Sequence, residues 1–147
     1  MGYHQFSFEK LAVWQEARLL AKEIYLVTNN FPSEEKFGLS QQIRRAAVSI
    51  CSNIAEGTSR HSAKDQAYFT TIAYGSLMEL LNQAIIANDL EYVSEKQLAS
   101  IREKVQPLSF KLSNLKKSQL SQLSGLKMLL LMLFSWSIYA PLKPLNL

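Results

Sequence analysis

Residues 41–57 would form a helix with three distinct faces rather than the usual two. At 100° per residue, one face is an apolar stripe made of Leu39, Ile43, Ala47, Ile50 and Ile54. Polar residues lie roughly opposite this stripe: Arg45, Ser49, Ser52 and Glu56. A seam of small residues with an arginine at one end lies between these two faces: Arg44, Val48, Cys51 and Ala55. Because a surface helix needs only one apolar stripe, the seam predicts a second helical neighbour.

Hydrophobic spacing predicts four helices separated by turn signals. The expected ranges are 8–30, from between 33 and 40 to 57, from 62 to about 89, and from 94 to about 119. Connections of a few residues favour an antiparallel up-down-up-down bundle over residues 1–125. The sequence contains no strand-like alternation, no GxGxxG and no P-loop pattern. We therefore expect an all-α four-helix bundle.

Individual residues mark the expected helix ends. Ser62 and Ser94 are placed to cap the third and fourth helices, the latter through a capping box with Gln97. Gly57 is a candidate left-handed cap at the end of the second helix. Pro107 falls inside the fourth helix and should bend it or remove one backbone hydrogen bond.

The third helix is apolar around much of its circumference. One stripe on it is continuous with the expected core, and a second stripe comprises Ala67, Tyr74, Met78, Leu81 and Ile85. A helix that is apolar on two sides is usually buried on two sides. We therefore expect the chain to form a homo-oligomer, with interface residues on the second and third helices: Arg44, Val48, Cys51, Ala55, Tyr74, Met78, Leu81 and Ile85.

The positive charge is concentrated in the C-terminal third of the chain. Of the net charge of +4, residues 100–147 contribute seven Lys/Arg against Glu103 alone. Such asymmetry is compatible with two interpretations: binding of RNA, DNA or another acidic partner, and a well-solvated basic helix end with no partner. The candidate phosphate-binding residues are Arg45, Arg102, Lys104, Lys111, Lys116 and Lys117. For Arg45, a phosphate contact and a structural ion pair are both open, whereas Arg44 is better placed to bridge subunits.

No constellation of catalytic or metal-binding residues is evident. His4 and His61 have no second ligand at helical spacing, so neither a metal nor a cofactor is expected. Cys51 reads as a packing residue, and Glu56 and Asp65 read as helix-end carboxylates. A single cysteine and no signal peptide indicate the cytoplasm.

Residues 126–147 form an apolar C-terminal extension, which includes the run MLLLMLF at 128–134. This run is shorter than the roughly 20 apolar residues that span a bilayer, so no transmembrane insertion is expected. Packing on the bundle or on a neighbouring subunit is the favoured interpretation. A membrane-surface helix and a shifted reading frame are the alternatives.

Several segments resemble one known family: residues 8–14 (FEKLAVW), 31–39 (FPSEEKFGL), 42–50 (QIRRAAVSI), 53–57 (NIAEG) and 72–80 (IAYGSLMEL). In order and spacing they are similar to the four-helix-bundle proteins encoded in intervening sequences of bacterial 23S ribosomal RNA genes, often labelled S23 ribosomal protein. The resemblance covers roughly residues 6–118. It departs from the family at Cys51, where relatives commonly have proline, and after about residue 119.

The resemblance implies a ring-like homopentamer and carries no catalytic residues. It also implies kinship with the accessory variability determinant of diversity-generating retroelements, a basic bundle that binds nucleic acid and a reverse transcriptase. The leading hypothesis is a non-enzymatic, oligomeric RNA-binding accessory protein. The alternative is a protein-interaction scaffold that uses its apolar C-terminus to bind a protein partner. A hydrolase or nuclease would require metal ligands that the sequence does not supply.

Overall fold

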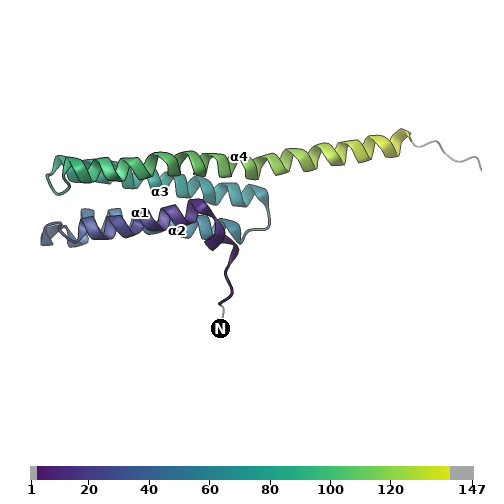
Figure 1. Cartoon of the computed structure of the whole chain (residues 1–147). Helices are drawn as coiled ribbons and strands as arrows, with labels where there is room; N and C mark the ends of the chain where they lie inside the picture. Colours follow the sequence, from purple (N-terminus) through teal and green to yellow (C-terminus); the bar gives the residue numbers. More distant parts are fainter. Residues whose placement is uncertain (1–2, 140–147) are drawn as a thin grey trace, which may run out of the picture.

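The computed structural model describes residues 3–139, with side chains described through Gln122. Four α-helices pack side by side (Figure 1): α1 (Ala12–Thr28), α2 (Leu39–Thr58), α3 (Ala63–Asp89) and α4 (Glu95–Tyr139). Two short 3₁₀ helices, η1 (Ser7–Lys10) and η2 (Ser33–Phe37), precede α1 and α2. The described residues form no strand, which confirms the all-α class and the four helices expected from the sequence.

Each helix contacts two others, because α2 lies between α1 and α3 while α4 lies between α3 and α1. Hydrogen bonds between helices show their relative directions. Ser49 of α2 is bonded to Ser76 of α3 (2.8 Å), and Gly57, further along α2, lies against Phe69, earlier in α3. α2 and α3 are therefore antiparallel.

The core consists of apolar residues contributed by all four helices. Leu20, Ile24, Ile43, Ile50, Leu77, Leu80, Ile101, Leu108 and Leu112 are fully buried. Their 3–4 spacing on each helix is the pattern of left-handed helix packing. At its far end the core includes one polar pair, in which the hydroxyl of Thr70 donates to Oε1 of Gln119 at 2.9 Å.

The expected N-caps are present. The hydroxyl of Ser62 accepts the backbone N–H of Asp65 (3.0 Å), and the hydroxyl of Ser94 accepts that of Gln97 (3.3 Å). In return, the side chain of Gln97 accepts the backbone N–H of Ser94 at 2.9 Å, which completes the capping box. The prediction that helices begin at Ser62 and Ser94 is confirmed within one residue.

Two helix ends differ from expectation. The first helix begins at Ala12 rather than Phe8, since residues 7–10 form η1. The fourth helix does not end near Gln119, because Gln119 is buried against α3 and the helix continues to Tyr139, passing through Pro107. The last part of α4 extends past the ends of the other three helices (Figure 1).

The C-terminal extension is only partly described. Residues 126–139 belong to α4, while residues 140–147 lie outside the described residues. The prediction that this extension packs on the bundle or on a neighbouring subunit concerns side chains outside the described ones. Among the described helices, none is long and apolar enough to cross a membrane.

The prediction that Gly57 is a left-handed cap is wrong, because no described glycine has a positive φ. Gly57 instead lies inside α2, where a Cβ atom would come within 3.2 Å of the Cβ of Phe69. Glycine is needed here for the close approach of α3. Gly75, in the exposed part of α3, has nothing within 4 Å of an added Cβ.

These two glycines allow a matched test of helix packing. Gly75→Ala should raise the free energy of unfolding by about 0.5–1 kcal/mol, since alanine is the better helix former. Gly57→Ala should fall clearly short of that gain, because its Cβ would crowd Phe69. Urea denaturation of both variants measures the difference. Equal stabilisation at the two sites would contradict the close approach at Gly57.

Candidate nucleic-acid interface

A shallow groove of about 600 Å³ follows the outer face of α2. It is lined by residues from α1, η2 and α2: Tyr25, Lys36, Phe37, Gln41, Arg44, Arg45, Val48, Ser49 and Ser52. We call this the α2 groove. Three of its lining residues are cationic and none is a carboxylate, so it has the charge of an anion-binding surface.

Glu35 precedes Lys36 in sequence, but its carboxylate does not line the groove, because it bonds to the backbone at the start of α2. Its Oε2 accepts the backbone N–H of Leu39 at 2.8 Å, at the positive N-terminal end of α2. A Cβ at Gly38 would lie 2.5 Å from that oxygen, so glycine at this position makes room for the carboxylate. The contact holds the junction of η2 and α2, and with it the position of Phe37.

Aromatic rings accompany two of the cations. The guanidinium carbon of Arg44 lies 5.0 Å from the ring centroid of Tyr25, and the ammonium of Lys36 lies 5.5 Å from that of Phe37. Both distances fall in the range of cation–π contacts. The Phe37 ring is 79% exposed, an unusual position for a large apolar side chain.

Arg44 joins α2 to α1 within one chain. Its Nε donates to the hydroxyl of Thr28 (2.7 Å) and its Nη2 donates to Oδ1 of Asn29 (3.0 Å). Both acceptors lie at the C-terminal end of α1, where the helix dipole favours a cation. The sequence favoured Arg44 as a bridge between subunits; the structure shows a bridge between helices of one chain, and a contact with a second subunit stays a prediction.

Arg45 is exposed, and it takes no part in the contacts with Thr28 and Asn29. Its side chain has no ion pair within the described part of the chain. Although adjacent helix positions differ by 100°, both arginines line the α2 groove.

The candidate cations of α4 divide into two sets. Lys104 contacts Oε2 of Glu23 at 2.6 Å, and Lys111 forms an ion pair with Glu16. These two lysines therefore link α4 to α1, also antiparallel, and are partly neutralised. Arg102, Lys116 and Lys117 have no carboxylate partner among the described side chains.

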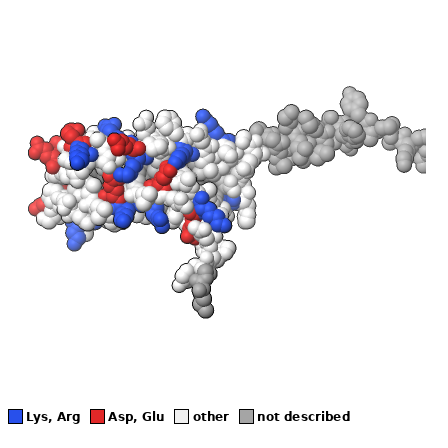
Figure 2. Space-filling model, in the orientation of Figure 1, with Lys and Arg blue, Asp and Glu red and all other residues white. Residues whose placement is uncertain are grey.

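Acidic residues are unevenly placed on the surface. Figure 2 shows carboxylates gathered at the left end of the bundle, and Figure 1 places the turn from α3 to α4 there. Asp89, Glu91 and Glu95 are all exposed around this turn. The turn from α1 to α2 lies at the same end of the bundle (Figure 1), where the rings of Phe31 and Tyr92 are 5.6 Å apart between centroids.

The seam on α2 has a helical neighbour within the chain. Cys51 packs partly against the core, and the positive charge of Arg18 on α1 acts on its thiol. Ala55 is also half-buried, whereas Val48 is 45% exposed. In a four-helix bundle each helix has two adjacent neighbours, so the seam is explained by α1 and does not by itself require a second subunit.

The second stripe of α3 is less completely covered. Ala67 is buried, and Met78, Leu81 and Ile85 pack partly against the core. Tyr74, on the side of α3 that faces Leu112 and Lys116 of α4, remains 37% exposed. These residues leave apolar surface along α3, which we call the α3 stripe: Tyr74, Met78, Leu81 and Ile85.

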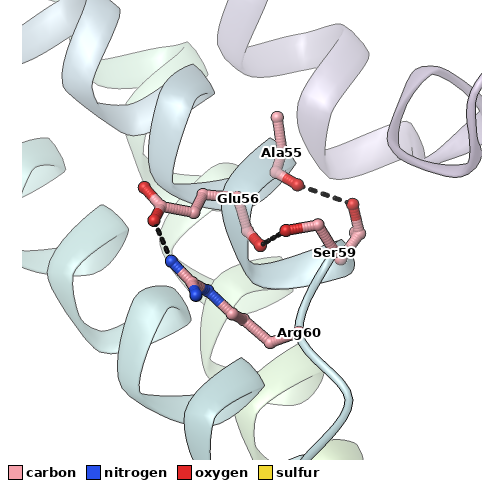
Figure 3. Close-up of polar contacts among 5 residues, drawn as sticks. Ala55, Glu56, Ser59 and Arg60 are labelled. Atoms are coloured by element: carbon pink, nitrogen blue, oxygen red, sulfur yellow. Dashed lines mark hydrogen bonds and ion pairs between the residues drawn. The ribbon is translucent and has the colours of Figure 1, made fainter.

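No catalytic grouping forms among the described residues. Glu56 forms an ion pair with Arg60 at the end of α2, where hydroxyls cap the last carbonyls (Figure 3). Asp65 is engaged with Ser62 at the start of α3, so the two carboxylates serve separate helix ends. Burial raises the pKa of the Cys51 thiol to about 11, which keeps it protonated at neutral pH. The described residues hold no cluster of metal-binding side chains.

Sequence reasoning identified Arg45 but missed Tyr25, Lys36 and Phe37. Lys36 and Phe37 lie in η2, where helical spacing gives no information about which side chains share a face. The one available signal was that Lys36 and Phe37 are adjacent, in the connection between two predicted helices.

The clamp between α1 and α2 can be tested by a matched pair of substitutions. Arg44→Lys should lower the free energy of unfolding by about 1 kcal/mol, since an ammonium cannot reproduce the two-point contact with Thr28 and Asn29. Arg45→Lys, on the same helix but exposed, should change it by less than about 0.5 kcal/mol. Chemical denaturation measures both. An equal change in the free energy of unfolding at the two positions would show that the Arg44 contacts do not stabilise the packing of α1 on α2.

Comparison with known proteins identifies the family. Residues 9–114 match the family of 23S rRNA-intervening sequence proteins. Among solved structures, the chain is similar to a protein of unknown function from the S23 ribosomal protein family of Bacteroides thetaiotaomicron VPI-5482, with 25% identity and a TM-score of 0.65; the match covers 72% of this chain and 99% of that one. A search of curated proteins found no match. The chain belongs to the family of 23S rRNA-intervening sequence proteins.

Proposed function

We propose that this protein is a non-enzymatic, oligomeric bundle that binds RNA through the phosphate backbone in the cytoplasm. The observation that carries the proposal is that four of the six candidate cations have no carboxylate partner among the described side chains: Arg45, Arg102, Lys116 and Lys117. Membership of a family named for 23S rRNA intervening sequences supports RNA as the partner.

Contacts of this kind position a protein on nucleic acid without reading its sequence. Each neutralised phosphate releases counterions, so affinity falls steeply as salt is added. Oligomerisation would repeat the unpaired cations in every subunit and strengthen the combined field. The proposal therefore has two parts that can be measured separately, self-association and RNA binding.

The α3 stripe is the proposed contact between subunits. A charge introduced there should separate the subunits, since it would have to be buried in an apolar interface. By light scattering, the wild type should have several times the chain mass of 16.7 kDa, and the family resemblance suggests five copies. Tyr74→Glu should reduce that mass, whereas Leu26→Glu, on an exposed site of α1, should not. A wild-type mass equal to that of one chain would contradict the proposed self-association.

RNA binding can be tested with a fluorescein-labelled RNA hairpin and fluorescence anisotropy. Raising salt from about 50 to 200 mM should weaken binding roughly tenfold or more, as expected for a few phosphate contacts per site. Replacing Arg102, Lys116 and Lys117 by Gln should weaken binding more than replacing Lys22, Lys64 and Lys96, which removes the same charge from other exposed sites. No binding at low salt, or binding indifferent to salt, would overturn the RNA proposal in favour of a protein-interaction scaffold.

A further inference from the structure

The α2 groove combines a cationic lining with two properties that a purely electrostatic surface does not need, an exposed aromatic ring and the volume of a ligand site. It is lined by three cations and no carboxylate, and it has an exposed aromatic ring at one end. Its volume of about 600 Å³ lies within the usual range of ligand sites, roughly 300–1,000 Å³. Among the described large apolar side chains only Tyr3 is more exposed than Phe37, so the ring is accessible to a partner.

The geometry points to a subsite for single-stranded RNA in the α2 groove, in which a base stacks on Phe37 and successive phosphates contact Lys36 and Arg45. This inference rests on the proposed function, and it adds a site and a strand type. Stacking on an aromatic ring requires an unpaired base, because the faces of bases within a duplex are already covered. The groove would therefore favour single strands over duplexes.

Each lining residue fits one part of a nucleotide chain. The ring of Phe37 offers a stacking surface, with the ammonium of Lys36 5.5 Å from its centroid and able to reach a neighbouring phosphate. Arg45 is unpaired within the described part of the chain and presents a planar fork that suits phosphate. Gln41 and Ser52 add hydrogen-bonding groups to the walls.

Arg44 supports the groove rather than being its main ligand. Nε and Nη2 are committed to Thr28 and Asn29, and its guanidinium lies over Tyr25. These contacts fix the wall between α1 and α2, while the charge remains beside the groove. Glu35 acts in the same sense at the other end, because its bond to Leu39 holds η2 against α2. Hydrogen bonds thus fix both sides of the subsite, between α1 and α2 and between η2 and α2.

The test compares two labelled probes on the full-length protein: an eight-nucleotide oligouridylate and an RNA duplex of eight base pairs. Phe37→Leu should weaken oligouridylate binding at least about fivefold, as expected for loss of one stacked base, and leave duplex binding within about twofold. Phe110→Leu, an exposed aromatic of α4 outside the groove, is the matched control and should change neither. Arg45→Gln should reduce the salt slope for oligouridylate by about 0.7.

The outcomes separate this inference from the proposed function. If the wild type binds neither probe at low salt, the proposed function fails and the subsite fails with it. If the wild type binds both probes but Phe37→Leu behaves like Phe110→Leu, the subsite is overturned while backbone binding stands. Equal losses on single strand and duplex would exclude stacking. A change in molecular mass for Phe37→Leu, with RNA affinity unaltered, would make the groove a contact between protein subunits.

Discussion

Close packing of α2 against two helices at once is the constraint on which the rest of the structure depends. α1 and α3 both lie against it, and small residues make this possible: Ala46 and Ala47 are buried, and Gly57 admits the Cβ of Phe69. The Ser49–Ser76 hydrogen bond satisfies two hydroxyls at the same interface. With two sides of α2 occupied, only one outward strip remains, and that strip carries Arg45 and Ser52. The position of the α2 groove is therefore a consequence of the packing of the core.

The same packing explains why the cations of α4 are not equivalent. α4 lies against α1, whose Glu16 and Glu23 face it, so Lys111 and Lys104 acquire carboxylate partners. Exposed pairs of this kind add little to stability, about 0–1 kcal/mol each, but they cancel charge locally. α2 carries one carboxylate, Glu56, near its C-terminal end, where it pairs with Arg60 rather than with Arg45. The number of basic residues on a helix is thus a poor guide to where a polyanion binds, and the distribution of partners is a better one.

Much of the fold followed from the sequence because its signals are local. Helical periodicity identified the four helices, and side-chain caps placed two of their starts at Ser62 and Ser94. Gly57 was misread because glycine serves both as a left-handed cap and as a point of close approach, and only the position of Phe69 distinguishes the two. The seam on α2 was assigned to another subunit because the sequence cannot say which neighbour covers a stripe. In the structure α1 covers part of it, through Arg44 and Cys51.

The candidate site was harder to predict than the fold because it is assembled from non-helical and distant residues. Arg45 was identified from its place opposite the core, but Phe37 lies in η2 and Tyr25 lies one helix earlier. Their convergence depends on two contacts. Glu35 of η2 bonds to Leu39 at the start of α2, and Arg44 of α2 bonds to Thr28 at the end of α1. Each of these contacts places a charged group at a helix terminus of the sign that favours it. The helix dipoles that stabilise the turn between α1 and α2 therefore also bring the aromatic rings and the cations to one surface.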